Sequence, residues 1–573
     1  MAKSMGMNLA SGLQGMLKDG HSSYEGVDEA ILRNINAAKE LAAIVRTSLG
    51  PNGKLELARW PCNARMNKLV VNHLEKTIVT SDGATIVQEL DVLHPAAKMV
   101  VMASQMQEQE SGDGTILVVT LTGELLKLAA DLLREGLHTA EILEGYRAAY
   151  LKVQDILPSL VCHTVKDVRS KDELAFAIKA VIGSKQYGFE DVLAPIVAEA
   201  CLAVMPPLPS KASVSVEHVR VCKLLGGSAA DSHVVHGMVV SRDAEGWIKR
   251  AENAKVAVFA CGLEASSTET KGTVLIRTGE ELMSYNKASL FRMGEEKVVE
   301  DIIKAIAEAG TKVIIAGGTV SDMCMHFIEK YGMMIVKVQS KWELRRICNA
   351  VHATAMVRMG APTPDEMGSC SLVEVREVGL KKVTVFSQDK QDSRIATIVL
   401  RASTGSLLND LERAVDDSVA CVRGLCRDPR FVPGGGATEM ELAHQIFKHG
   451  EVQTGLDQYA IKKFGEALEV IPRILSETSG QDAEKVLAAL RTAHANGEAH
   501  VGVDVDEDGT SDKTAEGVVD LLSTKESALR LAVDAAVTVL RVRVRKGDAM
   551  PLLLRYCCPL TCPGRDESIR VSG

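Results

Sequence analysis

The chain has 573 residues, several times the length that one hydrophobic core usually serves, so three or more domains are expected. Apolar residues make up 46% and charged residues 25% of the sequence, as in ordinary soluble globular proteins. The net charge of −9 argues against a surface for nucleic acid or anionic membrane. Because the sequence also lacks an apolar run of membrane-spanning length and a signal-peptide core, we expect a cytosolic protein.

Thirteen cysteines are scattered along the chain, an odd number that indicates reduced and mostly buried thiols. Three of them, Cys557, Cys558 and Cys562, lie close together near the end of the sequence and could ligate zinc in principle. They lack a second ligand pair at a standard spacing, which favours the reduced thiols over a metal site.

The first 150 residues are predicted to be mostly helical, because apolar residues recur at helical spacing between clear start and stop signals. The elements expected, in chain order, are a helix over Asp28–Leu49, strands over Lys68–Asn72 and Lys76–Thr80, a helix start at Ser81-Asp82-Gly83, and helices over Pro95–Gln109 and Thr115–Arg134.

The middle of the chain alternates short apolar strands with helices, which predicts a parallel sheet covered on both faces. The strands expected are Lys255–Cys261, Lys312–Ala316 and Met333–Val338, and the helices are Val298–Ala309, Ser321–Lys330 and Trp342–Ala353. Thr268–Met293 is rich in polar and methionine residues and is expected to form an excursion from this domain.

From Asp410 onward the pattern is helical again. The helices expected are Leu411–Gly424, Glu439–His449, Leu456–Leu475, Asp482–Ala495 and Lys525–Val542, with an acidic loop over His500–Asp512. Helical ends around an α/β middle predict one domain formed by both ends of the chain, with a second inserted into it.

Three motifs in the helical ends offer bare backbone or a helix start to a phosphate. Thr47–Gly53 (TSLGPNG) and Gly434–Gly436 let a ligand approach the main chain closely. Gly112–Thr115 precedes a helix, whose free N–H groups and positive dipole attract anions. Asp113 in this turn would repel a phosphate unless a hard cation such as Mg²⁺ bridged the two.

Two further motifs carry carboxylates: Asp82 in the tight turn VTSDG, and the pair Asp416-Asp417 in LERAVDDSV. Taken one at a time, the motifs are more simply explained as helix caps, turns, or a helix with one buried and one solvated aspartate. Their order and combination along the chain are what favour a nucleotide site.

In this order, SLGPNG, TSDGAT, GDGT, ERAVDDSV and VPGGGATE resemble the nucleotide-site signatures of the group II chaperonins, the TCP-1 family. The resemblance extends from about Leu13 to Val542. It implies a multidomain α and α/β fold with three domains. These are a mostly helical equatorial ATPase domain (1–150 and 405–573), a hinge-like intermediate domain (151–220 and 370–404), and an α/β apical substrate-binding domain (221–369) with a helical lid protrusion at about 265–295.

The resemblance also implies roles for single residues. Asp113 matches the Mg²⁺ ligand, Asp82 the carboxylate near the γ-phosphate, and Asp417 the hinge-borne carboxylate that acts on the attacking water. The positions matched to the nucleotide, with the ribose contacts last, are Leu49, Gly50, Pro51, Gly83, Gly112, Gly114, Thr115, Gly435, Gly436 and Asp520.

The cofactors implied are ATP and Mg²⁺, and hydrolysis would be coupled to domain closure because one carboxylate arrives from a separate domain. The partners implied are other chaperonin subunits in a hetero-oligomeric double ring and unfolded client proteins. Ser321–Tyr331 matches the helix that faces the ring cavity, although Met323 and Phe327, four residues apart, could equally be core.

The chain departs from the family pattern at several places. Ile116-Leu117 replace hydroxyl residues after GDGT, and an Arg-rich tail follows Val542. Two segments are extra, Ala288–Met293 and Lys54–Arg65. The second is expected to bulge outward as a surface loop, and the alternative is that it displaces Gly50–Gly53 and weakens ATP binding. These departures leave open a ring subunit that binds nucleotide but hardly hydrolyses it.

A third interpretation, from another class, is a Rossmann-type metabolic enzyme that uses Ala316-Gly317-Gly318 after a strand. This glycine pair lacks the full dinucleotide fingerprint, and the interpretation leaves the motifs of the two helical ends unexplained.

Overall fold

The computed structural model describes residues 27–50, 68–71, 75, 77–186, 188–207, 210, 212–263, 288–379, 381–388, 395–505 and 509–542. Several features expected from the sequence fall outside these residues. They are Pro51, the extra segment Lys54–Arg65, most of the protrusion at 265–295, and the tail after Val542 with its three cysteines.

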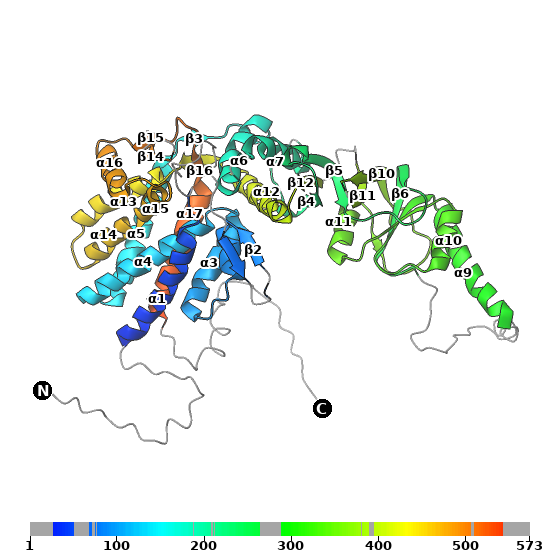
Figure 1. Cartoon of the computed structure of the whole chain (residues 1–573), viewed down its shortest axis with the longest axis horizontal. Helices are drawn as coiled ribbons and strands as arrows, with labels where there is room; N and C mark the ends of the chain where they lie inside the picture. The colour runs from blue at the N-terminus through cyan, green and yellow to red at the C-terminus, as the bar shows by residue number, and fades with distance from the viewer. Residues whose placement is uncertain are drawn as a thin grey trace, which may run out of the picture.

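Helices from both ends of the chain share one core, as the sequence indicates, and lie together at one end of the molecule (Figure 1). From the first part of the chain come α1 (Val27–Arg46), α2 (Gly83–Glu89), α3 (Pro95–Ser111), α4 (Thr115–Glu135) and α5 (Thr139–Ile156). From the last part come α13 (Ala437–Val452), α14 (Asp457–Leu468), α15 (Val470–Thr478) and α17 (Leu522–Arg541). Helix α16 (Ala483–Ala495) packs beside them, and its Val486 and Leu490 form a small separate cluster with Met440 of α13.

Helix α4 lies at the centre of this core and packs against α1, α14 and α17. Its side chains are buried on nearly every face, including Val118, Leu121 and Leu125, as expected for a helix that is apolar all round. The apolar stripe of α1 is buried against it, from Ile31 to Val45. The N-terminus of α4 is thereby fixed against the neighbouring helices by the packing of the whole helix.

A second core lies in the middle of the molecule, between the helical end and the sheet (Figure 1). It is formed by α6 (Lys171–Lys185), α7 (Glu190–Val204), α12 (Gly405–Leu425) and strand β12 (Ala396–Ala402). Helix α12 also packs against α3 of the first core. It therefore connects the two cores directly.

A nine-stranded sheet runs from this second core to the far end of the molecule (Figure 1), in the order β4-β12-β5-β11-β10-β6-β7-β8, with β9 beside β6. Its strands other than β12 are β4 (Val219–Leu225), β5 (His233–Val240), β6 (Arg250–Phe259), β7 (Thr311–Ala316), β8 (Met334–Lys337), β9 (Ala355–Met356), β10 (Gly368–Val378) and β11 (Lys381–Ser387). Helix α11 (Lys341–Val351) covers one face, and α9 (Ala288–Glu308) and α10 (Asp322–Lys330) cover the other.

Strands β6, β7 and β8 are parallel, as predicted, but the expectation of an all-parallel sheet is wrong. Strands β10, β11 and β5 join the sheet antiparallel. Strand β10 is half exposed and carries charged side chains such as Glu374 and Arg376, so its sequence lacks the continuous apolar run of a buried strand.

Two more expectations need correction. The predicted helix Leu456–Leu475 is divided into α14 and α15, since Pro472 has no N–H to donate to the carbonyl of Leu468. The segment expected as a loop, His500–Asp512, contains a hairpin of β14 (Val501–Asp504) and β15 (Gly509–Asp512).

Smaller strands complete the fold. A hairpin of β1 (Lys68–Val71) and β2 (Thr77–Thr80) precedes α2, and β13 (Arg430–Pro433) pairs with both β16 (Val519–Leu521) and β3 (His163–Thr164). Cys201, Cys222 and Cys421 are buried free thiols, as expected of reduced cysteines. Among the helices that the structure describes, none is both long and apolar enough to cross a membrane.

Candidate functional site

Two carboxylates from distant parts of the chain meet at one ammonium group. Lys185 Nζ lies 2.5 Å from Asp82 Oδ1 and 2.9 Å from Asp417 Oδ2. The three side chains are between 7% and 12% exposed, so this network is largely shielded from water. Because Asp82 precedes α2 and Asp417 lies on α12, the network joins the first core to the second.

Local sequence explains why each group points inward. Asp82 is the N-cap of α2, and its Oδ2 accepts hydrogen bonds from Thr85 N at 3.0 Å and Thr85 Oγ1 at 2.7 Å. Asp417 lies on the buried face of α12, whereas its neighbour Asp416 is exposed. Lys185 ends α6 on the apolar face of that helix, three residues after Ile182.

One ammonium cannot neutralise two carboxylates, and the two respond differently. Burial alone would raise the pKa of Asp82, but Lys185 and the donors of Thr85 outweigh burial and hold it well below its usual range. Burial raises the pKa of Asp417 to about 7 against the effect of Lys185, and the charges of Asp82 and Asp113 add to the rise. Asp417 therefore has the proton affinity of a general base near neutral pH.

A rigid helix start faces the same region. Gly114 is the N-cap of α4 with φ 82°, and the helix has no side-chain cap, so the N–H groups of its first turn have no helical partner. Gln107 Nε2 donates to the carbonyl of Asp113 at 2.8 Å and fixes the turn. These N–H groups can bind an anion such as phosphate.

Gly112 permits the close approach of α12 to this turn. A Cβ atom at Gly112 would lie 2.8 Å from the Cβ atom of Ala420 and 3.1 Å from the Cα atom of Asp417, and its φ of +77° is unfavourable for other residues. We expect Gly112→Ala to lower the free energy of unfolding by roughly 2–4 kcal/mol.

Gly136→Ala is the matched control for this prediction, measured by the same urea denaturation. Gly136 also has a positive φ, but nothing lies within 4 Å of its added Cβ atom. That change should cost only the backbone strain, about 1–2 kcal/mol. Equal losses in the two variants would contradict the close contact at Gly112.

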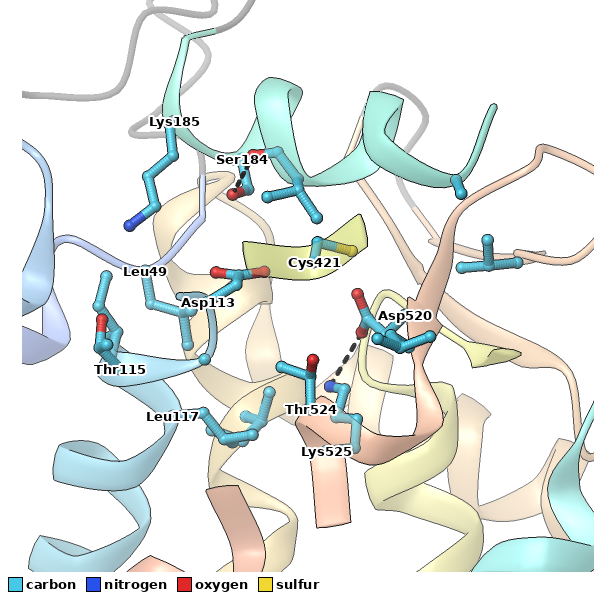
Figure 2. A pocket seen from close by; sticks show the side chains of 17 residues that line it. Leu49, Asp113, Thr115, Leu117, Ser184, Lys185, Cys421, Asp520, Thr524 and Lys525 are labelled. Atoms are coloured by element: carbon cyan, nitrogen blue, oxygen red, sulfur yellow. Dashed lines mark hydrogen bonds and ion pairs between the residues drawn. The ribbon is translucent and has the colours of Figure 1, made fainter. Parts of the chain in front are cut away.

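A cavity of about 180 Å³ lies between the start of α4, the end of α6 and the start of α17. Its polar lining includes Asp113, Thr115, Lys185, Asp520 and Lys525, and apolar residues make up much of the rest. In Figure 2, Asp113 and Lys185 lie on one side, Asp520 and Lys525 on the other, and Cys421 between them. This combination suits a ligand with an anionic end and an apolar end.

The antiparallel pair β13–β16 brings the second ligand-binding segment to this cavity. Val432 is opposite Asp520, and Gly434 N donates to Val518 O at 2.9 Å, so the glycine run follows directly beside Asp520. Gly435 and Gly436 have φ values of 62° and 82°, which favour glycine.

The residues predicted from the sequence are brought together only in part. Leu49, Asp113, Gly114, Thr115 and Asp520 line the cavity, and Asp82 and Asp417 reach it through Lys185. Five of the predicted glycines do not line the cavity: Gly50, Gly83, Gly112, Gly435 and Gly436. Gly50 faces Thr478, and Gly83 faces Ile116.

Sequence reasoning missed Lys185, Cys421 and Lys525, all of which line the cavity. A signal for Lys185 was present: a lysine on the apolar stripe of α6, in register with Ile178 and Ile182. Charged residues are rarely buried without a partner, so such a lysine indicates a buried carboxylate nearby.

The oxygen donors at the start of α4 fit Mg²⁺. The Asp113 carboxylate and the Thr115 hydroxyl are hard ligands of the kind Mg²⁺ prefers. No group of three or more histidine, cysteine, aspartate or glutamate side chains suited to a metal occurs in the described part of the chain. Mg²⁺ usually takes one or two carboxylates from the protein and its remaining ligands from water and substrate phosphates, and Asp113 can be such a carboxylate.

Comparisons with known proteins agree with these observations. The sequence model of the TCP-1/cpn60 chaperonin family matches residues 41–543. The chain is 48% identical over 535 residues to T-complex protein 1 subunit theta of Homo sapiens, covering 93% of this chain and 94% of that protein. It is 47% identical over 532 residues to the protein of the same name from Dictyostelium discoideum, covering 93% and 95%. The Arabidopsis thaliana protein of that name is 46% identical over 533 residues, covering 93% of each chain.

Matches of this length and identity confirm the resemblance drawn from the nucleotide motifs. They exclude the Rossmann-type metabolic enzyme. The chain belongs to the TCP-1/cpn60 chaperonin family.

Proposed function

We propose that this chaperonin subunit binds ATP with Mg²⁺ in the cavity and hydrolyses it, and that hydrolysis drives closure over unfolded client proteins. The observation that carries the proposal is the meeting of Asp82 and Asp417 at Lys185, on the wall of a cavity that also exposes the start of α4. Phosphates would lie against α4 and Lys185, and the ribose beside Asp520.

Each polar group then has a role in hydrolysis. Asp417 takes the proton from the attacking water, for which a pKa of about 7 is suitable. Lys185 reduces the repulsion between the γ-phosphate and the two carboxylates, and Asp82 keeps Lys185 in place. Mg²⁺, held by Asp113, would neutralise charge on the phosphates when it is bound.

Helix α12 is the element that couples chemistry to motion. Arg413 Nη1 donates to Thr80 Oγ1 at 3.1 Å, and Arg423 Nη2 donates to the carbonyl oxygens of Gln109 and Glu110, each at 2.7 Å. These contacts fasten α12, with Asp417 between them, to the first core. A hinge that released them would remove the base from the site, so hydrolysis would require closure.

We further propose the three-domain division expected from the sequence, with an equatorial, an intermediate and an apical domain, and action within a hetero-oligomeric double ring in the cytosol. The relatives are named as subunits of a complex, which supports the partners. On α10, Phe327 is buried, Met323 is half-buried and His326 is exposed. This helix would therefore offer His326 rather than Phe327 to a client.

Mg²⁺ titration of ATP turnover tests the proposal. In assembled particles, Asp113→Ala should raise the Mg²⁺ concentration for half-maximal turnover at least tenfold, about 1.4 kcal/mol, and weaken ATP binding as well. The matched control is Asp131→Ala, a carboxylate near the far end of helix α4 whose side chain is 43% exposed, which should leave both unchanged.

If Asp113→Ala has the same Mg²⁺ dependence as the wild-type chain, the metal assignment is wrong. If the chain binds ATP but its turnover is unaffected by every variant of Asp113, Asp82 and Asp417, the chain is a subunit that binds nucleotide with a structural role only.

A further inference from the structure

A buried lysine that the proposed mechanism does not use lies at the start of α17. Lys525 Nζ lies 3.0 Å from Asp520 Oδ2 and also forms an ion pair with Glu439 Oε1 (Figure 2 shows the contact with Asp520). The side chain of Lys525 is 12% exposed and that of Glu439 only 1% exposed, whereas Asp520 is 35% exposed. The lysine thus links one enclosed carboxylate to one that opens into the cavity.

This position is unfavourable for a cation unless negatively charged groups lie beside it. Lys525 is the fourth residue of α17, and the positive end of the helix dipole disfavours an ammonium in the first turn. Burial alone would lower the pKa of Lys525, but Asp520 and Glu439 hold it above its usual range. The cost of burying the charge is therefore offset by two specific carboxylates.

The cluster of Lys525, Glu439 and Asp520 contains more hydrogen-bond acceptors than Lys525 engages. Three charges are present, one positive and two negative, so the cluster keeps a net charge of −1. Glu439 Oε2 is buried without a hydrogen-bond partner among the described residues, and Lys525 occupies Oδ2 of Asp520. Because Asp520 lines the cavity, its other oxygen can accept a hydrogen bond from a neutral donor such as a hydroxyl, and it would repel a phosphate.

We propose that Lys525 is a positioning residue for the ribose, which holds Asp520 by one oxygen so that the other accepts a hydrogen bond from a ribose hydroxyl. Glu439 acts behind it and fixes the ammonium. This inference rests on the proposed function, because it takes the ligand to be ATP and Asp520 to be the ribose contact. It makes Lys525 a residue that determines how strongly the site prefers a nucleotide with ribose hydroxyls.

Competition between ATP and 2′,3′-dideoxy-ATP tests the inference. The full chain is purified in the assembly that it forms, its site is labelled with a photoreactive ATP analogue, and labelling is counted on peptides of this chain only. The wild-type chain should bind ATP roughly tenfold more tightly than the dideoxy nucleotide. In Lys525→Met this ratio should fall close to one, because ATP binds more weakly and dideoxy-ATP as before.

Two variants serve as references. Asp520→Asn, which removes the charged acceptor, should lower the ratio in the same direction. Lys485→Met, whose side chain is 85% exposed on α16, should leave it unchanged. If Lys525→Met fails to fold, Glu439→Gln combined with Lys525→Met removes the buried pair together and leaves no unpaired buried charge. The double variant should lose the ratio as well.

The outcomes separate the inference from the proposed function. If ATP and dideoxy-ATP weaken equally in Lys525→Met, or the ratio is retained, the positioning role is wrong. A wild-type chain that binds both nucleotides equally overturns the ribose contact and this inference with it. If ATP does not compete for labelling at all, the proposed function itself is wrong.

Discussion

Asp417→Asn is expected to abolish ATP turnover while nucleotide binding persists. The amide cannot take a proton from the attacking water, and loss of a general base costs about 10²–10⁴-fold in rate. Binding should survive, because Lys185 keeps its contact with Asp82 at 2.5 Å. The measurement is steady-state hydrolysis in assembled particles, with site-resolved nucleotide labelling on the same samples.

The same variant has a pH signature. A base with a pKa of about 7 is active when deprotonated, so wild-type turnover should fall as pH drops below about 7. Bound Mg²⁺ and nucleotide add charge nearby and shift the pH at which this fall in turnover occurs. In Asp417→Asn the fall itself should be absent. The matched control is Asp416→Asn, the exposed neighbour on α12, which should keep both rate and profile. Full turnover in Asp417→Asn would contradict the assignment of the base.

Lys185→Met is expected to destabilise the fold by about 3–5 kcal/mol, because it leaves two buried carboxylates without their cation. Without the ammonium, the pKa of Asp82 is no longer held below its usual range, and the pKa of Asp417, already above that of the unfolded chain, rises further. The folded state then binds more protons, so the loss should shrink as pH is lowered from 8 to 6. Urea denaturation at several pH values measures both effects.

Lys179→Met provides the control on the same helix. Its ammonium lies 2.9 Å from Asp191 at the surface, with side chains 56% and 87% exposed. Removing it should change stability by less than about 0.5 kcal/mol at every pH. If the two lysine variants behave alike, the buried network contributes no more than a surface pair.

Much of the site could be predicted from the sequence because its parts are local. The turn before α4, the cap at Asp82 and the glycine run before α13 each follow from a few consecutive residues. The simpler explanation of the Asp416-Asp417 pair, a helix with one buried and one solvated aspartate, also agrees with the structure, in which Asp417 is buried and Asp416 is exposed. These features depend on residues next to each other in the sequence, so they can be recognised without knowledge of tertiary contacts.

What the sequence did not predict depends on contacts between distant segments. Lys185 is 103 positions from Asp82, and Lys525 is 86 positions from Glu439. At such separations, no regular spacing in the sequence indicates that the two residues form an ion pair. The antiparallel strands β10 and β11 were missed for a related reason, since each is stabilised by its neighbours in the sheet rather than by an apolar run of its own.

The central claim is that this chain is one subunit of a larger, ATP-hydrolysing ring. Native mass measurement of the tagged full chain, isolated from its own cells, tests that claim most directly. We expect an assembly many times heavier than the 61.5 kDa chain, in which other chaperonin subunits accompany it. Recovery of the chain as a stable monomer of 61.5 kDa with full ATP turnover would contradict it.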